Sequence, residues 1–211
     1  MNNTETLRGE ISYLRKLADS GRKGPILGGA FLAGAGVVFG VACFISGAGE
    51  IGWIHLRGPA QLYLWLSASA VFAMFWVFMF WRLRGRSPAS VATNATAVFG
   101  TIWSASGAGV MVVFACTLIV ESVTNSPVVL MAYIPSIFAF YGTAWFTSAV
   151  LAKRGWMALA GGAAFGFAFL MALLTNTPAQ ILVMGVGLVL LLTLSGLKLA
   201  QDETRPDEAR A

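Results

Sequence analysis

Charged side chains are scarce in this sequence: they make up 11% of its 211 residues, whereas hydrophobic residues make up 57%. Soluble domains contain about 25% charged and 45–50% apolar residues. The composition, with a mean hydropathy of +0.76, is therefore typical of a membrane protein. No charged residue lies inside any of the long apolar runs. Because charges at mid-membrane depth mark proton relays and ion paths, their absence weighs against an ion-coupled pump.

Metal-binding and redox-active residues are also few. The single histidine is His55, and the two cysteines are Cys43 and Cys116, so no zinc, haem or iron–sulfur spacing exists. Both cysteines are expected in the outer half of the membrane as small buried thiols, and a disulfide between them requires the first and third spans to touch. Since no nucleophile–base pair or carboxylate dyad presents itself either, we expect neither enzymatic activity nor a cofactor.

Long apolar runs are what the sequence has in abundance. A spanning helix needs about 20 apolar residues, because its backbone must satisfy its own hydrogen bonds across the hydrocarbon core. Six runs meet this length: 25–47, 60–81, 97–120, 127–151, 156–175 and 179–197. The sequence thus predicts an all-α integral membrane protein whose six-helix bundle, residues 25–199, leaves no room for a soluble domain.

The basic residues are distributed unevenly between the loops. Of the 14 Lys and Arg residues, only Arg57 falls on one side of the predicted bundle. By the positive-inside rule, this bias predicts that both termini are cytoplasmic, in an integral protein of a bacterial inner membrane. The net charge of +5 is then an orientation signal with a weak attraction to the lipid bilayer, and no nucleic-acid partner is expected.

Two terminal segments flank the predicted bundle. In residues 1–24, Leu7, Ile11 and Leu14 recur with helical spacing and predict a short amphipathic helix over 4–20. Its mixed-charge polar face leaves open whether it packs under the bundle, against a partner or on the membrane surface. Residues 200–211 lack apolar periodicity and are expected to form a disordered tail.

Small residues recur four positions apart within the spans. Such pairs lie on one helix face and let two helix backbones approach closely in lipid. The candidates for helix packing are Gly24 and Gly28, Gly36 and Gly40, Gly162 and Gly166, and the third-span residues Thr101, Ala105 and Gly109. Sequence alone does not decide whether these faces pack within one bundle or between protomers.

Hydroxyl groups are the main polar groups available inside the spans. The candidates are Ser67, Thr101, Ser104, Tyr133, Ser136, Tyr141, Thr143 and Thr147. They are able to line a narrow path for a neutral solute, but hydroxyls in spans also bond to neighbouring helices or to their own backbone, and we favour this packing role. Pro135 is expected to kink the fourth span, because proline leaves the carbonyl of Met131 without its helical donor.

Two further surface features are predicted at the membrane interfaces. An outer-face polar cluster gathers Glu50, His55, Arg57 and Glu121, where a lone histidine is more typical of a solvated side chain than of a metal ligand. At the opposite interface, the aromatic run over 76–81 precedes Arg82, Arg84 and Arg86, which is the pattern of an interfacial anchor.

One short pattern occurs twice along the chain. Arg22-Lys23-Gly24, Gly28-Gly29 and Pro59-Ala60-Gln61 are echoed by Lys153-Arg154-Gly155, Gly161-Gly162 and Pro178-Ala179-Gln180. The echo raises the hypothesis of two duplicated hairpins with the same orientation.

These observations leave two functional classes. The first is an accessory, scaffolding or self-assembling membrane subunit, whose partner is another copy of the chain or another membrane protein. The alternative is a passive channel or facilitator for a small neutral or weakly acidic solute, lined by the hydroxyl and tyrosine side chains of spans two to four.

Overall fold

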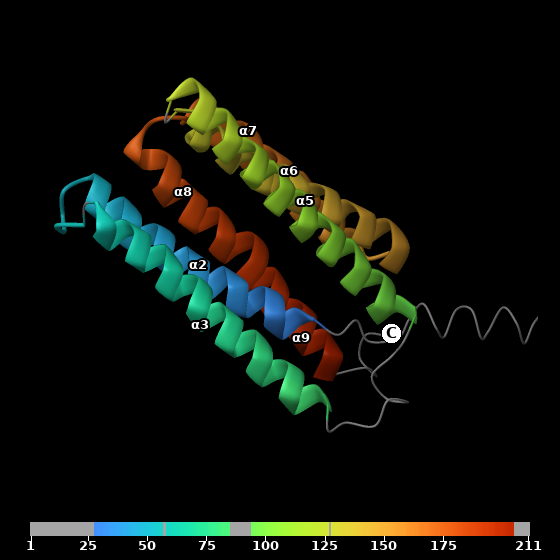
Figure 1. Ribbon diagram of the computed structural model, residues 1–211. Coiled ribbons are helices and arrows are strands. Elements are labelled where there is room, and N and C mark those ends of the chain that lie inside the picture. Colours follow the sequence, from blue (N-terminus) through green and yellow to red (C-terminus); the bar gives the residue numbers. More distant parts are fainter. Residues whose placement is uncertain (1–27, 57, 85–93, 127, 205–211) are drawn as a thin grey trace, which may run out of the picture.

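The computed structural model describes residues 28–56, 58–84, 94–126 and 128–204 (Figure 1). Within these ranges the chain is helical and contains no strand. Six helices are long and apolar enough to cross a membrane. The predicted fold class, an all-α membrane protein with six spanning helices, is therefore confirmed. The amphipathic helix predicted over 4–20 and the candidate packing residue Gly24 lie outside the described residues.

The first five spans are single α-helices, whereas a π-helix interrupts the sixth. The spans are α2 (Gly29–Glu50), α3 (Pro59–Arg84), α5 (Asn94–Thr124), α6 (Val128–Ala152), α7 (Gly155–Leu173) and the sixth span, which comprises α8 (Pro178–Leu188), the π-helix η1 (Val189–Leu194) and α9 (Ser195–Thr204). The third span extends beyond its predicted limits at both ends, since α5 continues past the apolar core into polar residues.

Local sequence explains where several helices begin and end. Pro59 and Pro178 open α3 and α8, where a missing N–H costs no hydrogen bond and the fixed φ suits the helix. Asn125 follows α5 with φ 53°, and Asn176 lies in the turn after α7 with φ 65°. Asparagine tolerates this left-handed conformation, which turns the chain sharply after a helix. Lys153 adopts it too, with φ 52° in the tight turn between α6 and α7.

The last span is longer than predicted. Helix α9 includes residues 200–204, so the prediction of a disordered tail is wrong for these residues, while 205–211 lie outside the described part. Two contacts explain the extension. Helix α9 packs against α2, and Asp202 accepts a 2.7 Å hydrogen bond from the Arg154 guanidinium at the start of α7.

The spans form two layers of three helices (Figure 1). In the first layer, α2 lies between α3 and the sixth span. In the second, α6 lies between α5 and α7. The layers meet where the sixth span passes α7, so α3 and α5 are the helices with the least packing. Because α2 begins beside Gly196 and Ala200 of α9, the first span starts at the end of the bundle where the last span finishes.

Glycine brings α2 and the sixth span into backbone contact. A Cβ added to Gly36 would lie 2.6 Å from the backbone nitrogen of Thr193 and 2.9 Å from the carbonyl oxygen of Leu188. A Cβ on Gly196 would lie 2.5 Å from the backbone nitrogen of Ala33. Real Cβ atoms do not approach so closely, and small residues are what permit such packing in lipid.

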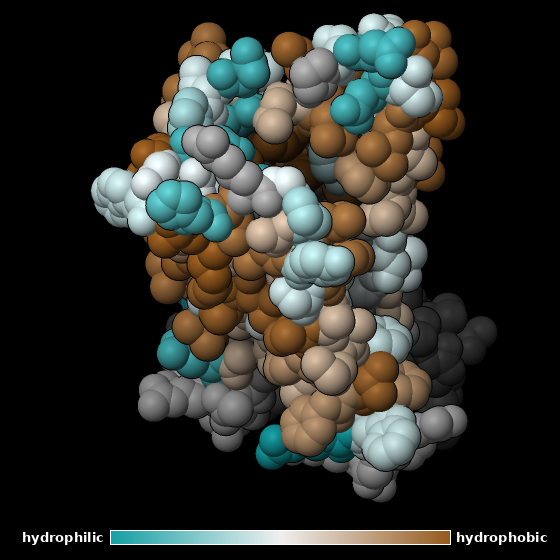
Figure 2. Space-filling model, turned by 60° about the vertical axis from the view of Figure 1, so that its left-hand side comes forward, coloured by the Kyte–Doolittle hydropathy of each residue, from teal (hydrophilic) through white to brown (hydrophobic). Residues whose placement is uncertain are grey.

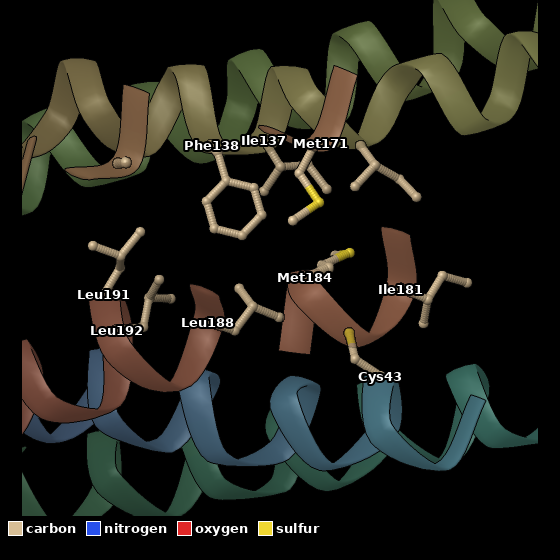
Figure 3. Close-up of a cluster of buried hydrophobic side chains, with 11 residues drawn as sticks. Cys43, Ile137, Phe138, Met171, Ile181, Met184, Leu188, Leu191 and Leu192 are labelled. Carbon is tan, nitrogen blue, oxygen red and sulfur yellow. The ribbon is translucent and has the colours of Figure 1, made fainter. Parts of the chain in front are cut away.

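The core lies between the layers. Phe138 of α6 and Met171 of α7 point from the second layer toward Leu188 and Met184 of α8, and Cys43 of α2 closes the cluster from the first layer (Figure 3). Phe138, Met171 and Cys43 are fully buried. The sixth span is therefore the element that both layers share.

The two layers have corresponding helix orders. Placing the first three spans on the last three matches α2 with α6, α3 with α7 and α5 with the sixth span. Under this correspondence, the central helix of one layer matches the central helix of the other, and the flanking helices match as well. Matched spans run in opposite directions, because they are three spans apart in the chain. The duplicated hairpins predicted from sequence are packed differently, since α2 and α3 are neighbours in one layer while α7 and α8 belong to different layers.

The outer surface is apolar over its middle. In the view of Figure 2, hydrophobic side chains cover the central part, and strongly hydrophilic ones gather at the upper and lower ends. Large exposed hydrophobic side chains on the spans include Leu66 and Met74 of α3 and Leu159 and Phe169 of α7. A bilayer accommodates such a surface, which supports an integral membrane location.

Candidate functional site: the interface between the two layers

The hydroxyls proposed as a lining do not converge on one path. Ser67, Thr101, Ser104, Thr143 and Thr147 are exposed, while Tyr133, Ser136 and Tyr141 are half-buried. Several hydroxyls donate to a carbonyl of their own helix, with Ser67 bonding to Leu64 at 2.8 Å and Thr143 to Ala139 at 3.0 Å. Thr101 and Ser136 do the same. The hydrogen-bonding capacity of these hydroxyls is thus used within their own helices.

The candidate glycines differ in whether a neighbouring helix occupies the space that a side chain would fill. Gly36 and Gly40 face the sixth span, and a Cβ on Gly109 would lie 2.6 Å from the ring of Phe140. In contrast, nothing lies within 4 Å of a Cβ added to Gly162 or Gly166.

Two other small candidates lie at the margins of the described bundle. Gly28 precedes α2 with φ 142°, beside the ring of Phe99. Ala105 is exposed on α5.

The outer-face polar residues do not form a metal site among the described residues. Glu50 and His55 are exposed, Glu121 is half-buried, and Arg57 lies outside the described residues.

The cysteines are not both buried. Cys43 is fully buried, as predicted, but Cys116 is exposed on α5, and both thiols are free. The prediction of a buried thiol is wrong for Cys116, because α5 packs mainly against α6 and presents the face bearing this residue to the outside.

Gln180 joins the two layers near the start of α8. Its side chain is fully buried, and its Nε2 donates to the carbonyl of Met131 at 3.0 Å and to that of Met171 at 3.2 Å. Met131 is the residue whose carbonyl Pro135 deprives of its helical donor. One amide of α8 thus donates to the α6 carbonyl that Pro135 leaves without its helical donor and also binds the end of α7.

The echoed Pro-Ala-Gln triplets share this local design. Gln61 occupies the third position of α3 and donates from Nε2 to the fully buried Ser46 hydroxyl of α2 at 3.0 Å. Gln180 occupies the same position in α8. In both cases proline opens the helix, and the glutamine two residues later reaches the preceding span. The sequence contained this signal, but only the structure shows that Gln180 meets the carbonyl freed by Pro135.

Charged residues join the layers at the opposite end of the bundle. Besides the pair formed by Arg154 and Asp202, the Lys198 ammonium of α9 lies 4.8 Å from the ring centroid of Trp156 in α7. Attraction between an ammonium and an aromatic face stabilises this contact.

Trp156 belongs to an aromatic nest, which we define as Phe99, Trp103, Tyr141, Trp145 and Trp156. Ring centroids are 5.1 Å apart between Trp103 and Trp145, 5.8 Å between Trp103 and Tyr141, and 5.6 Å between Trp145 and Trp156. Phe99 lies 6.3 Å from Trp145. The nest spans α5, α6 and α7, and sequence analysis missed it because its members are spread over three helices.

Two indole N–H groups of the nest and the hydroxyl of the neighbouring Ser148 are buried without a hydrogen-bond partner among the described residues. Nε1 of Trp103, Nε1 of Trp145 and Oγ of Ser148 have no hydrogen-bond partner among the described residues. A buried polar group left unpaired costs about 1–3 kcal/mol, so three such groups in one region need an explanation.

No protein-family model, curated protein or solved structure matches this chain.

Proposed function

We propose that the protein is a self-assembling multi-pass subunit of a bacterial inner membrane, with both termini cytoplasmic. The orientation rests on the placement of thirteen of the 14 basic residues on one predicted side. The assembly rests on the outer faces of α5 and α7, and its partner is a second copy of the chain.

The packing inside the bundle supports this assembly. At several glycines an aromatic ring of a neighbouring helix fills the space that a side chain would occupy: Phe140 lies over Gly109, Phe165 over Gly142 and Phe138 over Gly187. Each ring would lie 2.6 Å from a Cβ added at that glycine. Aromatic rings in glycine notches are thus a regular means of helix contact in this molecule.

The open positions beside Gly162 and Gly166 are the main observation that supports the proposal. They lie one turn apart on the outer face of α7, and nothing within 4 Å fills them. Gly100 and Gly107 leave similar open positions on α5. Exposed rings that suit such notches are available on α3, where Phe78 is 60% exposed. Small-residue faces of this kind bring helices of different chains together in lipid.

Filling the open notches is expected to weaken assembly without unfolding the protein. Leucine at Gly162 or Gly166 protrudes where a partner helix would approach, and we expect the apparent dissociation constant to rise about tenfold. Fluorescence energy transfer between labelled copies in lipid vesicles measures this change. Val41→Leu, at an exposed position of α2, is the matched control and should leave the energy transfer unchanged. Identical transfer in all these variants would contradict the proposal.

A passage for a small neutral or weakly acidic solute is the second candidate. Corresponding layers in opposite orientation occur in many transporters, and π-helices recur at functional sites. In addition, the hydroxyl of Thr193 in η1 is buried without a partner among the described residues.

Solute flux separates the two candidates. For an assembly subunit, liposomes containing the protein are expected to swell no faster in glycerol, urea or acetate than empty liposomes. Ser136→Leu and Thr143→Leu should then alter stability alone. Faster swelling that Thr193→Val abolishes would establish the passage and displace the assembly proposal.

A further inference from the structure

The aromatic nest offers hydrogen-bond donors in an otherwise apolar surrounding. An indole N–H is a donor only, and both Trp103 and Trp145 present one without an acceptor among the described residues. Trp145 is fully buried, and Ser148 lies one helical turn further along α6 at 2% exposure. Two indole N–H groups of the nest and the neighbouring Ser148 hydroxyl therefore lack a hydrogen-bond partner among the described residues.

The Ser148 hydroxyl is not bonded to a carbonyl of its own helix. Thr101, Ser136 and Thr143 each donate to a carbonyl three or four residues earlier in their own helix. The Ser148 hydroxyl has no such bond, although a helix normally offers one. Its proton thus remains available to an oxygen that enters the nest.

We propose that the aromatic nest binds the headgroup of a quinone from the bilayer. A quinone ring is planar and neutral, and its carbonyl oxygens accept hydrogen bonds but donate none, so it complements aromatic walls that carry two unpartnered indole N–H donors among the described residues. Neutrality matters because Trp145 and Ser148 are almost completely buried, and an anion would lose its hydration there. The planar ring also suits stacking against indole and phenol rings.

In this proposal the ligand enters the nest from its more exposed side, at Trp103 and Tyr141. Trp103 and Tyr141 are half-buried, whereas Trp145 is fully buried. Because the Trp103 and Trp145 rings are in contact, with centroids 5.1 Å apart and planes at 80°, the quinone takes the place of this contact when Trp103 rotates outward. In this proposal the two indole N–H groups donate to the carbonyl oxygens of the quinone.

Binding is tested with the full chain in lipid nanodiscs and a decyl-substituted benzoquinone. We expect saturable binding by equilibrium dialysis. Trp145→Phe keeps a ring but removes the N–H, and Ser148→Ala removes the hydroxyl; each should weaken binding about three- to tenfold. Trp76→Phe, at a position of α3 that is 50% exposed, should not change it. Binding that is absent, or equal in all variants, would overturn the proposal.

Two further measurements separate a binding role from a structural one. The reduced quinol should bind more weakly than the quinone, because a phenolic oxygen is a weaker acceptor for the two indole N–H groups than a quinone carbonyl oxygen. In protein carrying 5-fluorotryptophan at its seven Trp positions, the quinone should shift the fluorine resonances of Trp103 and Trp145, assigned with the Phe variants, and leave that of Trp76 in place. Equal affinity for both redox forms, or displacement of the quinone by phospholipid or fatty acid alone, would refute the quinone site.

Discussion

Replacing Gly36 by alanine is expected to lower the free energy of unfolding by about 1–3 kcal/mol, as overpacking does in other cores. The added Cβ would lie 2.6 Å from the backbone nitrogen of Thr193 and 2.9 Å from the carbonyl oxygen of Leu188. Backbone atoms cannot rotate out of the way as a side chain does. The α2 helix must therefore move away from the sixth span, which also separates the Cys43 side chain from the shared core.

Gly162→Ala is the matched control for this substitution. It adds the same methyl group at another helical glycine, but nothing lies within 4 Å of it. Since alanine favours a helix over glycine by roughly 0.5–1 kcal/mol, this variant should be as stable as the parent or slightly more stable. Thermal unfolding in a detergent that keeps the protein monomeric measures both variants, so that the proposed assembly face at Gly162 does not contribute. An equal loss in both would show that helix propensity, and not the contact with the sixth span, determines the result.

The spans themselves follow directly from the sequence, because charge is excluded from the hydrocarbon core whatever the helices pack against. The turns follow in part, since Pro59 and Pro178 open helices and asparagine supports the left-handed residues after α5 and α7. Neither effect depends on tertiary contacts. Residues 200–204 were missed for the opposite reason, because the pairing of Asp202 with Arg154 stabilises that part of α9 from another helix.

The arrangement of the spans in two layers could not be predicted. In a soluble protein the buried face of a helix is apolar and the outer face polar, but in lipid both faces are apolar. Helix α5 and the sixth span are both strongly apolar, yet 0% of the most apolar part of α5 is buried in the bundle, against 50% for the sixth span. Hydropathy therefore does not reveal which helix is central.

The same ambiguity affected the candidate residues. Thr143 shares a face with Ser136 in sequence, but its hydroxyl bonds back to Ala139, and sequence does not distinguish this from a lining role. Glycine spacing likewise does not separate Gly36, which packs against the sixth span, from Gly162, which is open. The freed carbonyl of Met131 was correctly anticipated from Pro135, but its donor is 49 residues away in the chain.

Gln180→Leu is the second substitution with a large expected effect. It removes the amide that donates to Met131 and Met171, and an unpaired buried carbonyl costs about 1–3 kcal/mol. The Met171 carbonyl keeps the hydroxyl of Thr175 at 3.3 Å, so most of the loss falls on Met131. Because leucine also removes the unpartnered Oε1 of Gln180, we expect a net loss of about 1–3 kcal/mol in the free energy of unfolding.

The equivalent change in the other Pro-Ala-Gln triplet provides the first control. Gln61→Leu removes a hydrogen bond to the Ser46 hydroxyl, which is able to rotate toward a carbonyl of its own helix. Gln61 is also only half-buried. The loss should therefore stay below about 1 kcal/mol, although the substitution and its place in the helix are the same.

A double-mutant cycle with Pro135 identifies the cause. Alanine at position 135 restores an N–H that donates to the Met131 carbonyl within α6, so this oxygen no longer depends on Gln180. Gln180→Leu should then cost about 1–2 kcal/mol less in the Pro135→Ala background than in the parent. Thermal or detergent unfolding of the four proteins gives the coupling energy. Additive effects would mean that Gln180 stabilises the bundle by filling space between the layers, and that the Met131 carbonyl is satisfied in another way.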